Sequence, residues 1–98
     1  TILNDLMLNT KISESSKLAH EVHQGMLKRL RKSYKGIKTL GVKQAPFVVL
    51  TGATMPAILV EVGFLSNTDE ANRLARSDHQ QALARAIATG IEAFLRDR

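Results

Sequence analysis

The stretch from Ala57 to Val62 is almost entirely apolar, and it constrains the fold more than any other part of the chain. A continuous apolar run of this length is typical of a strand that is covered on both faces, as in layered α/β proteins. A second run, Phe47–Leu50, precedes it, and the connection Thr51–Pro56 is too short for the crossover that parallel strands need. Two adjacent antiparallel strands are therefore predicted. Because two strands alone do not make a stable sheet, we expect an α/β fold in which they are the two C-terminal strands of a larger mixed sheet flanked by helices.

Apolar residues at helical spacing predict helices on both sides of these strands. A short helix is expected over Ile2–Met7, ending at Asn9 and Thr10, and a longer one from about Ser13 to about Ser33. The apolar stripe of the longer helix comprises Leu18, Val22, Met26 and Leu30, widened by Ala19 and Leu27. The stripe of the last helix comprises Leu83, Ala86, Ile87, Gly90, Ile91, Phe94 and Leu95.

Two capping boxes are predicted before the C-terminal helices. Asn67 is followed three residues later by Glu70, and Ser77 is followed by Gln80 at the same spacing. Each pair would mark the start of a helix.

Length and composition bound the class of protein. At 98 residues the chain is at most one domain, and it opens on Thr1 rather than Met, so we expect a processed or truncated product. The absence of cysteine excludes disulfides and thiolate metal sites. No apolar run approaches the roughly 20 residues that a membrane-spanning helix needs.

The formal charge of +5 is concentrated in one segment. Between residues 28 and 43 there is no acidic residue, and the basic ones are Lys28, Arg29, Arg31, Lys32, Lys35, Lys38 and Lys43. Such a run can attract nucleic acid, anionic lipid or an anionic wall polymer. The pattern favours a solvated helix end followed by a polar loop, because only Tyr34 offers an aromatic face for stacking. We therefore expect no nucleic-acid partner.

Glu61 is the candidate catalytic residue. It stands within Ile58–Phe64, which is otherwise apolar apart from Gly63. A buried carboxylate needs a cation, a donor or water. Active sites of α/β proteins lie beyond the carboxyl ends of strands, where Glu61 is expected. The alternative is a strand-end glutamate that simply reaches solvent.

Other polar residues carry weaker signals. His20 and His23 are three apart on the predicted helix and could share a face, but a catalytic zinc usually has three protein ligands and no third is evident. His79 falls in the first turn of the last helix, where we expect it to be exposed. The serines Ser15, Ser16 and Ser66 lack the sharp turn that presents a nucleophilic serine.

Taken together, these segments resemble a known family. Residues 40–75 read LGVKQAPFVVLTGATMPAILVEVGFLSNTDEANRLA and are similar to the signature of the zinc-dependent N-acetylmuramoyl-L-alanine amidases. The family pattern is a GV-K/R-x-A turn, a strand, and then MPA-apolar-LVE-x-GF-L/I-SN. The upstream IL-x-DL and S-x-x-LA-x-x-V stretches and the terminal LA-x-AI-x-x-GI pattern also fit. The resemblance covers essentially the whole chain.

The resemblance implies a function. Members of the family are bacterial peptidoglycan hydrolases, autolysins among them, which cleave the amide between N-acetylmuramic acid and the L-alanine of the stem peptide. Residues 1–98 would be the C-terminal part of one catalytic domain. Only the LVE-x-GF glutamate carries over, onto Glu61, which would take a proton from a zinc-bound water and pass it to the leaving amine.

The same resemblance implies that the zinc ligands, two histidines and a glutamate, precede this chain in the domain, and that His20 and His23 are not among them. The chain alone would then be inactive. Its expected partners are peptidoglycan and either the missing N-terminal half or a second copy paired through an open sheet edge. The expected location is the periplasm or the extracellular cell wall.

Two alternatives stay open. The chain could be a non-enzymatic basic module whose residues 28–43 bind an anionic polymer, or a structural helical domain in which Glu61 has no role. Neither accounts for the resemblance of Met55–Asn67 to the amidase motif.

Overall fold

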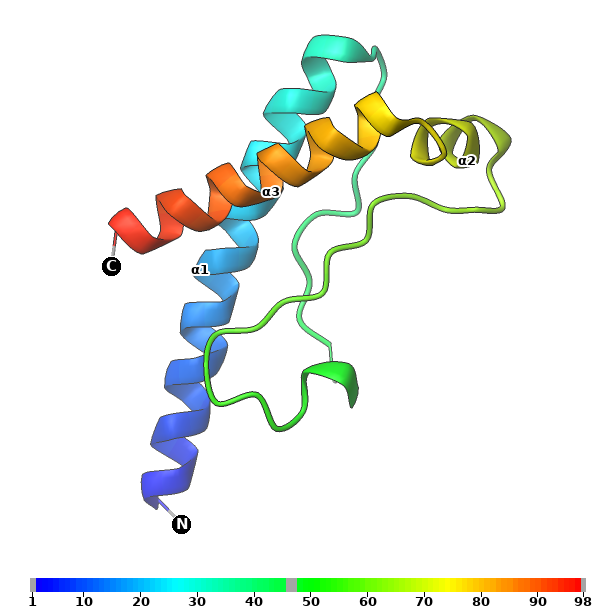
Figure 1. Ribbon diagram of the computed structural model, residues 1–98. Helices are drawn as coiled ribbons and strands as arrows, with labels where there is room; N and C mark the ends of the chain where they lie inside the picture. The colour runs from blue at the N-terminus through cyan, green and yellow to red at the C-terminus, as the bar shows by residue number, and fades with distance from the viewer. Residues whose placement is uncertain (1, 46–47, 98) are drawn as a thin grey trace.

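Helices dominate the computed structural model, which describes the backbone of residues 2–45 and 48–97 and the side chains from Leu8 onward in these ranges. The elements are α1 (Ile2–Ser33), the 3₁₀ turn η1 (Val48–Leu50), α2 (Thr68–Leu74) and α3 (Ser77–Arg96). Figure 1 shows α3 lying across α1, with a long irregular connection that descends from the end of α1 and returns to α2. Within the described residues, no helix has the length and apolar character needed to cross a membrane.

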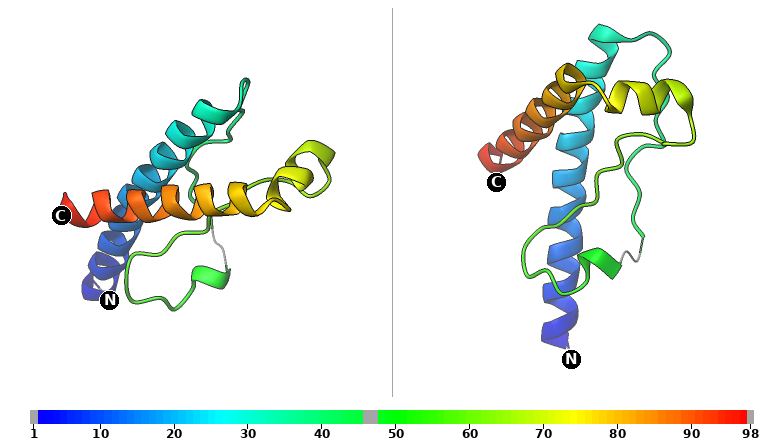
Figure 2. Two further views of the ribbon diagram at one scale, coloured as in Figure 1. Left: turned by 45° about the horizontal axis from the view of Figure 1, so that its top comes forward. Right: turned by 45° about the vertical axis from the view of Figure 1, so that its right-hand side comes forward.

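The crossing of α1 and α3 is the main tertiary contact, and it is seen in all three views (Figures 1 and 2). Two glycines lie where the helices meet. A Cβ atom on Gly90 would lie 2.5 Å from the Cα atom of Val22 and 2.9 Å from the carbonyl oxygen of Glu21. A Cβ atom on Gly25 would lie 3.0 Å from the carbonyl oxygen of Ala86. The absence of side chains at these two positions therefore allows the backbones to approach closely.

The core lies along this crossing. Its buried residues are Val22 and Met26 of α1 and Leu83 and Ala86 of α3. Partly buried side chains pack around them from all parts of the fold: Leu18, Leu30, Ile58, Val60, Leu74 and Ile87. Both predicted helical stripes are thus confirmed at their centres. Towards the end of the second stripe Gly90 and Phe94 are buried as predicted, whereas Ile91 and Leu95 are 41% and 58% exposed.

The predicted α/β fold is wrong. No strand or sheet forms among the described residues: Val48–Leu50 is a 3₁₀ turn and residues 57–62 are irregular. Phe47 of the first predicted strand lies outside the described residues. The physical reason is that a strand needs partners for its backbone N–H and C=O groups, and two short strands alone do not make a stable sheet. The predicted self-association required an open sheet edge, and the described residues form none.

Residues 57–64, here called the extended segment, lie against the two crossed helices instead. Ile58 and Val60 pack on the core, whereas Leu59 and Glu61 between and after them are exposed. This alternation is what a strand would show, with one face buried. The apolar run that predicted burial on both faces is therefore buried on only one.

Two details of the predicted helices also need correction. Helix α1 runs without a break through Asn9 and Thr10. These residues cost well under about 1 kcal/mol each relative to alanine, which is too little to end a helix that continues on both sides. The Ser77–Gln80 capping box does not form either, because Arg76 is the N-cap of α3 and makes no side-chain capping bond.

Gly90→Ala should destabilise the fold. The new methyl group would collide with the backbone of α1, and overpacking of this kind typically costs about 1–3 kcal/mol, which exceeds the roughly 1 kcal/mol gained in helix propensity. Urea denaturation followed by circular dichroism should show a lower free energy of unfolding. Thr89→Ala is the matched control. The side chain of Thr89 is exposed, so this substitution should change the free energy of unfolding by no more than about 0.5 kcal/mol. Equal stability of Gly90→Ala and wild type would contradict the close crossing.

Candidate functional site

Glu61 lies on the outward face of the extended segment, and its side chain is exposed. The residues before it, Ile58 and Val60, face the core, so the strand-like alternation directs Glu61 away from α1 and α3. The sequence left two possibilities open, a buried carboxylate with a partner and a glutamate that reaches solvent. The structure places Glu61 at the surface, where water and a ligand can reach it.

Both ends of the extended segment are tied down by hydrogen bonds. At the start, the backbone N–H of Ala57 donates to Oγ of Ser15 on α1, at 3.0 Å. At the end, the backbone N–H of Phe64 donates to Oε2 of Glu70 on α2, at 3.3 Å. Glu61 is thus held between two fixed points, although it belongs to no regular element. Ser15, whose surroundings in the sequence did not favour a nucleophile, anchors this backbone position.

The cap of α2 stabilises the second of these anchors. The side-chain Oδ1 of Asn67 accepts from the N–H of Glu70 at 3.1 Å, which confirms the predicted N-cap. The Glu70 carboxylate does not close a capping box on Asn67, because it accepts from Phe64 instead. Glu70 therefore takes part in both interactions: its backbone N–H is capped by Asn67, and its carboxylate anchors Phe64.

Four apolar residues close to Glu61 in the sequence are open to solvent. Leu59 is 45% exposed, Val62 43%, Phe64 57% and Leu65 78%. Exposed apolar groups that gather around a polar residue mark surfaces that contact another molecule or another part of a protein.

The candidate metal ligands do not come together. His20 is exposed, and His23 is partly buried with its Nε2 3.4 Å from Oγ1 of Thr39. Among the described side chains, no three of His, Asp or Glu gather closely enough to hold a metal ion. The residues shown here therefore do not fit a zinc site.

His79 is buried, with 6% of its surface exposed, so the prediction that it is exposed is wrong. Its Nδ1 lies 3.2 Å from the hydroxyl of Tyr34, and the two rings meet edge to face at 5.7 Å. The guanidinium carbon of Arg73 lies 4.4 Å from the centre of the Tyr34 ring. This contact joins the end of α1 to the start of α3. The contact could not be predicted from local patterns, because Tyr34 lies 45 residues before His79.

Burial lowers the pKa of His79, and the positive charges of Arg76, Arg73 and Arg29 lower it further, with only Asp78 opposing them. Asp78 is itself held as an anion, because its hydrogen bonds from Arg76 at 2.8 and 3.1 Å lower the pKa of its carboxyl to about 2. His79 is therefore favoured in its neutral form.

Comparison with known proteins identifies the family. The family model described as N-acetylmuramoyl-L-alanine amidase matches residues 6–93, which include most of both helices of the core and the whole extended segment. The chain belongs to the N-acetylmuramoyl-L-alanine amidase family. The resemblance drawn from Met55–Asn67 is thereby confirmed.

Similar proteins include several named amidases. The chain is 34% identical over 95 residues to the N-acetylmuramoyl-L-alanine amidase AmiC of Escherichia coli, covering 95% of this chain and 21% of AmiC. It is 32% identical over 80 residues to the uncharacterized protein YqiI of Bacillus subtilis, covering 82% of this chain and 36% of YqiI. It is 36% identical over 88 residues to the endolysin of Bacillus phage SPP1, covering 87% of this chain and 32% of the endolysin. The amidase chain thus spans between about a fifth and about a third of the length of these relatives. No solved structure matches it.

The stability of the amidase chain should fall as the pH drops below neutrality. Because the pKa of His79 is lower in the folded state than its ordinary value of about 6.5, the unfolded chain binds more protons just below that pH. The stabilisation is fully present above about pH 6.5 and is lost as the pH falls toward the pKa of the folded state. Urea denaturation between pH 8 and pH 5 measures the effect.

His79→Asn is the matched variant for this experiment, because asparagine can still form a hydrogen bond with the Tyr34 hydroxyl but does not titrate. Its stability should vary less between pH 7 and pH 5 than that of wild type. The same pH dependence in both proteins would show that other groups cause it.

Proposed function

We propose that this chain is the C-terminal part of the single catalytic domain of a peptidoglycan hydrolase, and that Glu61 is its proton-transfer residue. The hydrolase would cleave the amide between N-acetylmuramic acid and the L-alanine of the stem peptide. The observation that carries the proposal is that a family match across residues 6–93 contains one outward-facing carboxylate held between two anchored backbone positions. Relatives named as amidases support the reaction, and their coverage supports a chain that is part of a larger protein.

The geometry suits Glu61 to general acid–base catalysis. An exposed carboxylate can accept a proton from a water molecule as that water attacks the amide carbonyl carbon. The proton would then pass from Glu61 to the amide nitrogen, so that the carbon–nitrogen bond breaks and L-alanine leaves with a free amine. The anchors at Ala57 and Phe64 would hold the carboxylate at a fixed distance from the substrate.

The exposed apolar residues beside Glu61 would serve the same site. Leu59, Val62 and Phe64 lie within three residues of the carboxylate and are at least 43% exposed. We propose that they contact the remainder of the catalytic domain and so remove water from one side of Glu61.

The described residues do not supply a set of zinc ligands. We propose that the ligands of the intact amidase lie outside these 98 residues, and that the chain alone is therefore inactive. The proposed site of action is the bacterial cell wall, in the periplasm or outside the cell, because that is where peptidoglycan lies.

Glu61→Gln in the intact protein should abolish most turnover. Glutamine keeps nearly the same shape but cannot take up a proton near neutral pH, and general base catalysis contributes about 10²–10⁴-fold. The measurement is the release of stem peptides from purified peptidoglycan, with zinc content determined in parallel. We expect a loss of that order with zinc content unchanged.

Glu92→Gln is the matched control, because Glu92 is an exposed glutamate on α3 and the same substitution there should leave release almost unaltered. Near-normal release by Glu61→Gln would exclude Glu61 as the base. Loss of zinc together with activity would show instead that Glu61 is a metal ligand.

A further inference from the structure

The seven basic residues between Lys28 and Lys43, here called the basic strip, have no part in the proposed chemistry. All seven side chains are exposed: Lys28, Arg29, Arg31, Lys32, Lys35, Lys38 and Lys43. The two ion pairs found between described side chains, Lys17–Glu14 and Arg76–Asp78, involve none of them. The strip therefore presents its charge to solvent without an acidic counterpart in this part of the chain.

The favourable interaction of basic side chains with the C-terminal end of a helix accounts for only part of the strip. Arg31 and Lys32 lie in the last turn of α1, where basic side chains interact favourably with the helix dipole. Lys35, Lys38 and Lys43 follow the end of the helix, in the irregular connection that turns back from α1 (Figure 1). The positive charge thus continues along the chain beyond the point where a helix terminus could account for it.

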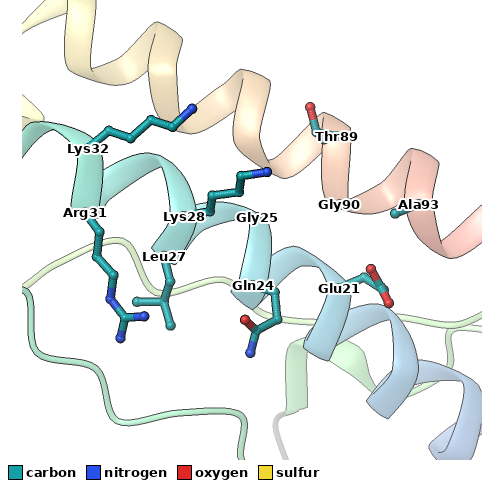
Figure 3. Close-up of a pocket in the computed structure, with 10 residues that line it drawn as sticks. All are labelled: Glu21, Gln24, Gly25, Leu27, Lys28, Arg31, Lys32, Thr89, Gly90 and Ala93. Atoms are coloured by element: carbon teal, nitrogen blue, oxygen red, sulfur yellow. The ribbon is translucent and has the colours of Figure 1, made fainter.

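The helical portion of the strip also borders a groove. Lys28, Arg31 and Lys32 line an open groove of about 640 Å³ whose opposite wall is formed by Thr89 and Ala93 of α3. Figure 3 shows Lys28 and Lys32 reaching toward α3, with Glu21 toward the Ala93 end of the groove. The basic residues are spread along an open surface rather than directed at one enclosed point, which suits a segment of a polymer better than a small anion.

We infer that the basic strip binds a flexible, non-aromatic polyanion with regularly spaced phosphate groups, such as a linear polyphosphodiester. Several spaced cations on a helix end and an adjoining irregular segment can each contact one phosphate of such a chain and release its counterions. Glu61 is not one of the seven residues of the strip, and this binding does not depend on the hydrolytic role proposed above.

Single-stranded nucleic acid fits the strip less well. Its binding sites combine basic grooves with aromatic faces on which bases stack. Tyr34 is the one aromatic residue between residues 28 and 43, and its ring is edge to face with His79 and covered by Arg73. The strip consequently offers no free stacking face.

A membrane surface is also a poorer partner. A helix that lies on a membrane needs an exposed apolar face opposite its basic one. The apolar face of α1 is packed on α3 through Val22 and Met26. Leu40 and Val42 are exposed between Lys38 and Lys43, but two aliphatic side chains in an irregular segment do not make such a face.

The test is a titration of fluorescently labelled poly(glycerol phosphate) with the intact protein at several salt concentrations. The logarithm of the association constant should fall linearly with the logarithm of salt concentration, with a slope of roughly −5 if all seven residues contact phosphates. Poly(dT) of equal charge and vesicles of phosphatidylcholine and phosphatidylglycerol in equal parts are titrated alongside and should bind no more tightly.

Paired substitutions locate the binding surface. Arg31→Gln with Lys32→Gln, and separately Lys35→Gln with Lys38→Gln, should each lower affinity at 0.1 M salt on the order of tenfold and reduce the steepness of the salt dependence by about 1.4. Lys17→Gln with Arg96→Gln removes the same charge from exposed positions outside the strip and should change affinity less than threefold. Circular dichroism checks that each variant is folded.

Binding that is independent of salt, or an equal loss in the control pair, would overturn the inference. Tighter binding of poly(dT) would assign the strip to nucleic acid, and tighter binding of vesicles would assign it to a membrane. Glu61→Gln should bind the polymer with unchanged affinity, so failure of the polymer to bind and failure of Glu61 as the base are distinguished by separate measurements.

Discussion

The structure depends on the close approach of α1 and α3 at Gly25 and Gly90. The second glycine leaves no room for even a methyl group between the two helices, because a Cβ atom there would lie 2.5 Å from the Cα atom of Val22. Close approach brings the apolar stripes of both helices into contact and buries Val22, Met26, Leu83 and Ala86 together. With few aromatic residues in the chain, this short-range packing of aliphatic side chains provides the core. The extended segment has no regular structure of its own and relies on that core for its position.

The candidate site follows from how the extended segment is held. Ile58 and Val60 pack on the crossed helices, and hydrogen bonds at Ala57 and Phe64 fix the two ends. Glu61 is left facing outward as the consequence of burying its alternate neighbours. One face of the extended segment therefore packs on the core, and the opposite face carries the candidate site. The basic strip is a different feature, because it begins on the exposed side of α1 and continues past the end of that helix.

Sequence patterns predicted the parts of the fold that local periodicity determines. The stripe through Leu18, Val22, Met26 and Leu30 and the centre of the stripe on α3 were predicted because a 3.6-residue repeat defines a helical face. The predicted strands were wrong because an apolar run does not reveal a pairing partner. It does not guarantee burial either, since Val48 and Val49 of the first run are 85% and 73% exposed. His79 was expected at the surface because it falls in the first turn of the last helix, and its burial against Tyr34 could not be predicted because Tyr34 is distant in sequence. Glu61 could be singled out because a carboxylate within an apolar run is unusual. The anchor between Ala57 and Ser15 could not be predicted, because it joins residues 42 apart in the sequence.

Hydrogen exchange measured residue by residue tests most directly whether crossed helices, rather than a sheet, hold the candidate site. Amides at the centres of α1 and α3, around Met26 and Ala86, should exchange slowly because they are hydrogen-bonded and packed. The amides of residues 59–62 lie in the irregular part of the chain and should exchange many times faster. That difference in exchange rate is expected if Glu61 lies on an irregular segment that packs on the helices through one face only. Protection at residues 59–62 equal to that of the helix centres would mean that these amides are paired in a sheet, and it would contradict the account.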